Sequence, residues 1–184
     1  METTMRSTVV CKTVKAKTLA AIGAVAAAVA LPQLFHVLGR LSGLGAALGE
    51  AFLPMHIAIF MVGLLAGPAA GFLSGAAAPM VSFALSGMPA AAMLPFMVIE
   101  LAAYGLLAGA LAQTKMPAIV KLLIAQTGGR AVRAAAILAG FHLLDTQVQP
   151  AVIWTSIVIG LPGLLLQWAL IPLAVFYIDQ RAQH

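Results

Sequence analysis

Charged side chains are scarce in this sequence. Asp, Glu, Lys and Arg make up 8% of its 184 residues, whereas a soluble domain carries about 25%. Hydrophobic residues make up 62%, so a water-exposed surface could not be built without large apolar patches. This balance argues against an ordinary soluble domain. It predicts an all-α, polytopic membrane protein, whose surface faces lipid.

Other features are missing as well. The one cysteine, Cys11, has no second cysteine with which to form an internal disulfide, and no cluster has the spacing of metal ligands, so we expect no metal and no cofactor. No P-loop motif is present, so the chain is not expected to hydrolyse nucleotide by itself. No basic stripe with interleaved aromatic residues supports a nucleic-acid partner.

What the sequence does have is a series of apolar stretches, most of them close to the length of about 20 residues that crosses a bilayer. Gly- and Pro-rich breaks separate them, as at Gly67-Pro68 and at 86–89. We therefore expect a single domain over residues 1–184 with six transmembrane helices. Their expected ranges are 18–38, 51–66, 69–86, 93–112, 117–141 and 151–178.

The basic residues in and near the connections predict the orientation, because cytoplasmic segments carry an excess of Lys and Arg. Residues 1–17 form a basic segment, and Lys115, Lys121 and Arg181 fall on the same side of a six-helix topology. Only Arg40 falls in an outer loop. Both termini are therefore expected in the cytoplasm, and the chain in the plasma membrane of a prokaryotic cell.

Two ionisable residues within the apolar helices are candidates for a ligand site. A charge at the centre of a membrane helix costs at least about 2.5 kcal/mol and marks function or a structural pair. Glu100 and Arg130 lie on antiparallel helices at a depth where they could meet. Arg130 could bind an anionic or carbonyl group of a ligand, or it could only neutralise Glu100. Arg133, one turn further along, is expected to reach toward the interface.

Five further residues complete the predicted binding site. His56 and Gln167 would add polar contacts, while Met88, Tyr104 and Trp154 would supply apolar walls. Each has a structural alternative: a lone histidine is often structural, Gln167 could bond another helix, and Trp154 could be an interfacial anchor. The segment 39–50 is expected to close over the ligand.

Alanines recur every four residues in the first apolar stretch, at Ala16, Ala20, Ala24 and Ala28. This spacing places them on one face of a helix, and small residues allow a second helix to approach closely. The face could dock a partner membrane protein or pack within the chain's own bundle. Spacing alone leaves both interpretations open.

Several local patterns, taken in order, resemble the S components of energy-coupling factor (ECF) transporters, in particular the pantothenate- and hydroxymethylpyrimidine-type members. The patterns are Leu53-Pro54-Met55-His56-Ile57, Gly63 to Gly71, Ser86-Gly87-Met88-Pro89, Glu100-Leu101 with Tyr104-Gly105, Gly129-Arg130, Gly160-Leu161-Pro162-Gly163 with Leu166-Gln167, and Ile171-Pro172. No single motif is diagnostic; their order and spacing carry the resemblance over nearly the whole chain.

The resemblance implies a subunit that binds a vitamin or vitamin precursor from outside and is not an enzyme. Uptake would be driven by partners, a transmembrane T component and two cytosolic ATPases, and the helix-one alanines would dock the T component. Two other classes remain as alternatives. An intramembrane enzyme would need a serine–histidine pair, for which Ser74 is poorly placed in its glycine motif. A membrane scaffold would need neither Glu100 nor Arg130.

Overall fold

The computed structural model describes residues 13–45 and 47–181, and every regular element in them is an α-helix. The helices are α1 (Val14–Leu41), α2 (Ala47–Phe52), α3 (Pro54–Ala66), α4 (Pro68–Ser86), α5 (Leu94–Leu111), α6 (Ala118–Leu143), α7 (Ala151–Ile159) and α8 (Leu161–Arg181). Of the basic segment expected at 1–17, residues 1–12 lie outside the described part. The prediction of an all-α chain is confirmed.

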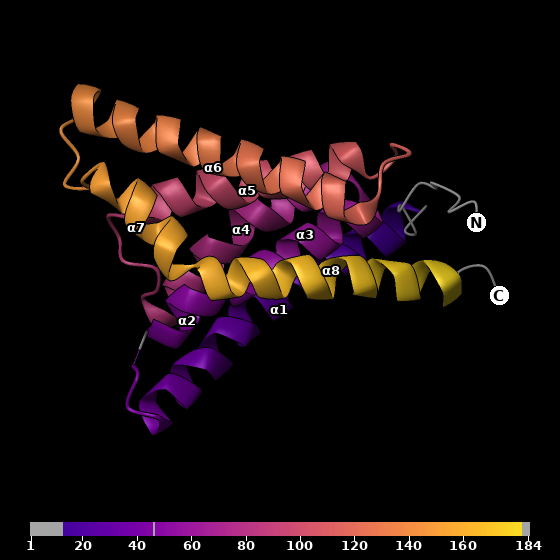
Figure 1. Cartoon of the computed structure of the whole chain (residues 1–184), viewed down its shortest axis with the longest axis horizontal. Coiled ribbons are helices and arrows are strands. Elements are labelled where there is room, and N and C mark those ends of the chain that lie inside the picture. The colour runs from indigo at the N-terminus through magenta and orange to yellow at the C-terminus, as the bar shows by residue number, and fades with distance from the viewer. Residues whose placement is uncertain (1–12, 46, 182–184) are drawn as a thin grey trace.

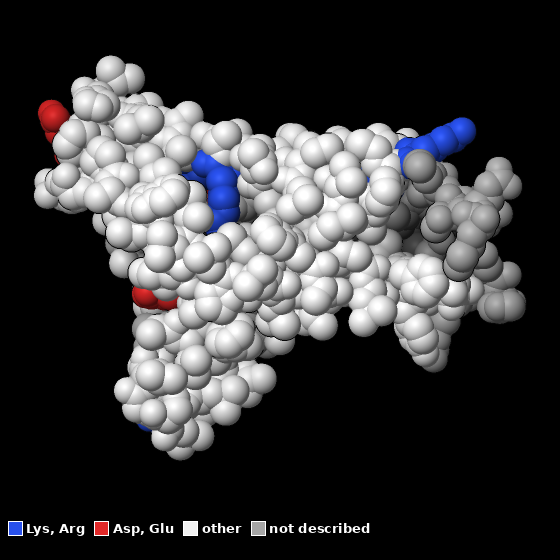
Figure 2. Space-filling model, in the orientation of Figure 1, with Lys and Arg blue, Asp and Glu red and all other residues white. Residues whose placement is uncertain are grey.

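Five stretches are long and apolar enough to cross a membrane: α1, α2 with α3, α4, α5, and most of α8. The face shown in Figure 2 carries few charged side chains, as a surface in contact with lipid requires. The helix α6 has 26 residues but is not among the five. Lys121, Arg130 and Arg133 lie within it and lower its hydropathy. The described helices are thus consistent with a membrane protein, and a sixth span stays a prediction.

Two of the expected helices are broken in the structure. The helix expected at 51–66 divides at Leu53, whose φ of 49° lies in the left-handed region, and the helix expected at 151–178 divides at Gly160. Pro54 and Pro162 follow these breaks closely. A proline lacks the N–H for the helical bond, and its ring clashes with the carbonyl four residues before it. The chain therefore gains two short helices, α2 and α7.

The two breaks lie against each other. A Cβ on Gly160 would approach Leu53 Cδ1 to 2.9 Å, and a Cβ on Gly163 would approach the Phe52 carbonyl carbon to 2.6 Å. The atoms near Gly163 are backbone atoms, so only glycine admits this close approach there. The junction of α7 and α8 therefore rests directly on the junction of α2 and α3.

Glycines also bring α4 and α5 together. A Cβ on Gly71 would overlap the backbone of Gly105, one on Gly105 would overlap the backbone of Gly71, and one on Gly75 would overlap the backbone at Leu101. This is the packing that small residues provide in membrane bundles. It leaves α5 in contact with α3, α4 and α6, so α5 is the central helix around which the site is built.

The alanine face of α1 is occupied within the chain. Ala28 is fully buried in the main core, while Ala20 and Ala24 are half-buried against the cluster of Val62, Ala66 and Ala70 on α3 and α4. Ala16, near the start of α1, is half-buried. Packing within the bundle, the alternative to docking, is thus what Ala20, Ala24 and Ala28 do in this structure.

The molecule has two different ends. The start of α1 and the end of α8 lie at one end, whereas α2 and α7 lie at the other (Figure 1). The loops that join α4 to α5 and α6 to α7 also reach this second end. These two loops and the two short helices thus gather at the end that lies far from the described termini.

Candidate functional site

A cavity of about 440 Å³ lies at the α2 and α7 end of the bundle. Its wall is formed by residues of every helix from α1 to α7 and of the connection between α4 and α5. The polar residues in the wall are Glu50, His56, Ser82, Glu100, Arg130, Arg133, Thr155 and Ser156. Four methionines line it as well: Met55, Met88, Met93 and Met97. A ligand site with mostly apolar walls and a few convergent polar groups has this composition.

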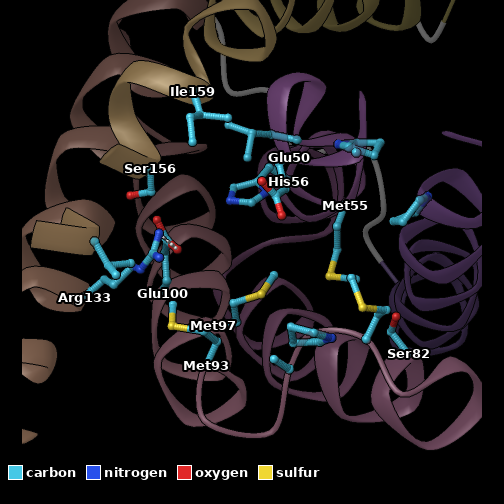
Figure 3. A pocket seen from close by; sticks show the side chains of 18 of the residues that line it. Glu50, Met55, His56, Ser82, Met93, Met97, Glu100, Arg133, Ser156 and Ile159 are labelled. Atoms are coloured by element: carbon cyan, nitrogen blue, oxygen red, sulfur yellow. Dashed lines mark hydrogen bonds and ion pairs between the residues drawn. The ribbon is translucent and has the colours of Figure 1, made fainter. Parts of the chain in front are cut away.

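Glu100 is held by two donors. Its side chain is 1% exposed, and its Oε2 accepts a hydrogen bond from Arg133 Nη1 at 3.0 Å, in an ion pair. Its Oε1 accepts a hydrogen bond from the Tyr104 hydroxyl at 2.6 Å. Figure 3 shows Arg133 and Glu100 pointing toward each other across the side of the cavity. The buried carboxylate is therefore neutralised within the protein.

The expectation that Arg133 reaches the interface is wrong, because Arg133 is the partner of Glu100. Arg130 and Arg133 are three residues apart, so both lie on the face of α6 that lines the cavity. Only one of them is needed to neutralise one carboxylate, and the geometry selects Arg133.

Arg130 forms no ion pair with any described residue. It lines the cavity, and its Nε is buried without a hydrogen-bond partner there. A guanidinium presents its N–H donors in a planar fork that suits a carboxylate or phosphate. A buried donor without a hydrogen-bond partner costs free energy. Arg130 is thus the group in this wall best placed to hold an anion.

His56 also has an unpaired polar atom in this wall, as do Arg130 and Arg133, whose Nε atoms are both without a partner among the described residues. It is buried at the start of α3 and lines the cavity, and its Nδ1 has no partner among the described residues. Its ring lies 5.4 Å from the Tyr104 ring, centroid to centroid. His56 and Arg130 therefore offer two unpaired polar atoms in the wall of one cavity.

Four of the seven predicted ligand residues lie in the cavity wall, and the other three do not. His56, Met88, Glu100 and Arg130 line the cavity. Tyr104 is buried behind it, bonded to Glu100, with its ring 4.8 Å from that of Phe60. Trp154 and Gln167 are not in the wall: Trp154 is 69% exposed, and Gln167 is fully buried elsewhere.

Gln167 belongs to a separate polar contact between α6 and α8. Its Oε1 accepts a hydrogen bond from Gln126 Nε2 at 2.8 Å, and Gln126 Oε1 accepts one from Trp168 Nε1 at 2.6 Å. Its structural alternative, a bond across helices, is the contact that the structure contains. This cluster ties the two helices together at a distance from the cavity wall.

Sequence reasoning missed several wall residues. Met93 and Met97 precede Glu100 by seven and three residues, so helical spacing alone could have found them on its face. Glu50 and Ser156 carried no such signal, because they reach the wall only through the breaks that create α2 and α7. The segment expected at 39–50 as a closing loop is helical at both its ends and contributes Gly49 and Glu50 to the wall.

Within residues 13–45 and 47–181, no group of three or more His, Cys, Asp or Glu side chains could hold a metal ion. Comparisons with protein-family models, with curated proteins and with solved structures gave no match. The resemblance to ECF S components consequently stays a prediction from the sequence.

Proposed function

We propose that this chain is a membrane protein that binds a small molecule carrying an anionic group, and that it acts as the substrate-binding S subunit of an ECF-type transporter. The ligand would be a vitamin or vitamin precursor of the pantothenate or hydroxymethylpyrimidine kind, and of these two pantothenate carries the carboxylate that Arg130 would bind. The membrane class rests on the apolar helices. The binding role rests on the cavity, and the transporter class rests on the sequence resemblance.

One observation carries the binding proposal: Arg130 lies in the cavity wall and has no ion-pair partner among the described residues. Glu100 is already paired with Arg133 and Tyr104, while Arg130 has no such partner. An unpaired charge within a membrane protein is expensive and marks a ligand site by default. A carboxylate or phosphate of the ligand would complete the set.

The rest of the wall supports a small organic ligand rather than a bare ion. The volume of about 440 Å³ is within the range of small-molecule sites. The methionine side chains are flexible and polarizable, so they can adapt to an apolar ligand body. His56 and Ser82 add hydrogen-bonding groups on the same wall.

The proposed topology takes α6 as the sixth span, so that both termini lie in the cytoplasm. The basic residues Lys115 and Lys121 near the start of α6 favour this orientation. The cavity then lies toward the outer surface, where a nutrient arrives. A T component and two ATPases would supply the energy for uptake, since the chain itself has no P-loop.

The direct test is to purify the full chain in mild detergent and identify co-purifying small molecules by mass spectrometry. Thermal stability is then measured across a vitamin panel that includes pantothenate and hydroxymethylpyrimidine. A ligand that binds only folded protein raises the unfolding midpoint. A co-purified vitamin that also raises the midpoint would support the proposal. No bound molecule and no shift across the panel would overturn it and favour a scaffold.

A further inference from the structure

Glu50 is a carboxylate at the mouth of the large cavity. It lies on α2, a helix without a buried residue, and it is exposed although it lines the cavity. Glu100, the other carboxylate in this wall, is buried. A side chain that is both exposed and part of the wall lies where the cavity opens. Glu50 is therefore within reach of a ligand without any movement of the core.

The two carboxylates differ in their partners. Glu100 accepts hydrogen bonds from Arg133 and Tyr104, and its contact with Arg133 is an ion pair. Glu50 forms no ion pair with any residue that the structure describes, and the same is true of Arg130. The wall of one cavity thus holds a cation and a carboxylate that are not paired with each other or with another described residue.

These two charges come from different parts of the wall. Arg130 belongs to α6 and lies one helical turn before Arg133, whereas Glu50 belongs to α2. Figure 3 shows Glu50 apart from the pair formed by Arg133 and Glu100. One small molecule that contacts both Arg130 and Glu50 must therefore reach across the cavity from α6 to α2, and its two ends meet charges of opposite sign.

The two charged groups require different chemistry from a ligand. A guanidinium only donates hydrogen bonds, and an ionised carboxylate only accepts them. We propose that Glu50 determines specificity by accepting hydrogen bonds from hydroxyl groups at the end of the ligand opposite the carboxylate that Arg130 binds. This inference rests on the proposed function and narrows its ligand. Pantothenate carries a carboxylate at one end and two hydroxyls at the other, whereas hydroxymethylpyrimidine has no carboxylate.

The test is isothermal titration of the full chain in mild detergent with three probes: pantothenate, panthenol, in which an alcohol replaces the carboxylate, and a pantothenate analogue without its two hydroxyls. Glu50→Gln should weaken pantothenate and panthenol about tenfold, as the loss of a charge-assisted hydrogen bond does. It should leave the affinity for the hydroxyl-free analogue unchanged. Arg130→Gln should do the reverse, weakening pantothenate and the hydroxyl-free analogue but not panthenol.

Asp145→Asn is the matched control, because it removes a negative charge at the same end of the molecule without changing the cavity wall. Asp145 has a φ of 49°, a conformation that asparagine tolerates. All three affinities should stay unchanged in this variant. If Glu50→Gln weakens the hydroxyl-free analogue as much as pantothenate, Glu50 acts through the structure of α2 rather than through the hydroxyls, and the inference is overturned.

Two further outcomes separate this inference from the proposed function. Unchanged binding of pantothenate in Glu50→Gln, or binding of another vitamin of the panel in place of pantothenate, would overturn the role of Glu50 and leave a vitamin-binding subunit. Tighter binding of the zwitterion γ-aminobutyrate than of pantothenate would replace the hydroxyls at Glu50 by an ammonium group and also overturn the inference. No binding of any vitamin by the unsubstituted chain would overturn the proposed function itself.

Discussion

Arg130 and Arg133 are chemically identical and one helical turn apart, yet they do different work. Arg133 neutralises a carboxylate that is 1% exposed, so it is part of what holds the fold together. Arg130 forms no ion pair with any described residue, so its charge is available to a ligand. This difference separates a stability phenotype from a binding phenotype on one helix face.

Substituting the two arginines should therefore give opposite results. Arg133→Gln leaves Glu100 buried without its cation and is expected to cost about 3 kcal/mol of stability, as breaking a buried pair does. Arg130→Gln should leave the unliganded protein as stable as before but abolish the ligand-induced rise in the unfolding midpoint. Differential scanning fluorimetry with and without the bound vitamin measures both. Equal loss of stability in the two variants would contradict this division.

A double variant provides the control for the ion pair. Glu100→Gln combined with Arg133→Gln removes both charges, so much of the stability lost in Arg133→Gln should return. No recovery would mean that Arg133 stabilises the protein through packing of its stem rather than through Glu100.

At the scale of the elements, the close contact of α4 and α5 depends on glycine. Gly105→Ala places a methyl group against the backbone of Gly71, and such overpacking costs about 1–3 kcal/mol. The variant should unfold at a lower temperature. Gly23→Ala on α1 is the matched control, because a Cβ there meets nothing within 4 Å. A larger loss in the control would contradict the packing described.

The contact between α6 and α8 makes a further prediction. Gln167→Ala removes the acceptor for Gln126 Nε2, and leaving that buried donor unpaired should cost about 1–3 kcal/mol. Ligand affinity should not change, because Gln167 is not in the cavity wall. Isothermal titration with the identified ligand checks this. A lower affinity at unchanged stability would return Gln167 to the binding site, where the sequence interpretation placed it.

The helices show how much of the fold could be predicted from the sequence. Apolar runs and Gly-Pro breaks predicted the helical class and the approximate ends of α3, α4, α5 and α6. They missed the breaks at Leu53 and Gly160, because a proline within an apolar run bends some helices and divides others; Pro79 and Pro172 lie inside intact ones. The free-energy cost of a charge within a membrane helix pointed to Glu100 and Arg130. Which arginine pairs with Glu100 depends on side-chain geometry, which sequence spacing cannot resolve.

For the whole molecule, the proposed topology predicts that α6 crosses the bilayer. Single cysteines in a Cys11→Ser background can be labelled in intact cells with a membrane-impermeant maleimide. Positions Ser42 and Asp145 lie in connections at the cavity end, and Gln113 lies between α5 and α6. We expect Ser42→Cys and Asp145→Cys to react from outside, and Gln113→Cys to react only after permeabilisation. Reaction of Gln113 and Asp145 from the same side would contradict a crossing by α6.

The α7–α8 junction packs against the α2–α3 junction. One part of this contact is therefore synthesised much later than the other. Leu53 and Gly160 are far apart in the chain, so the support for α2 is translated long after α2 itself. Until then Glu100, Arg130 and Arg133 face a groove with one side missing, because Val152, Thr155, Ser156 and Ile159 have not yet been added. A nascent chain that stops at Leu143 therefore carries all the charges of the site but no enclosed chamber. The enclosed cavity can form only after the last quarter of the protein has been synthesised.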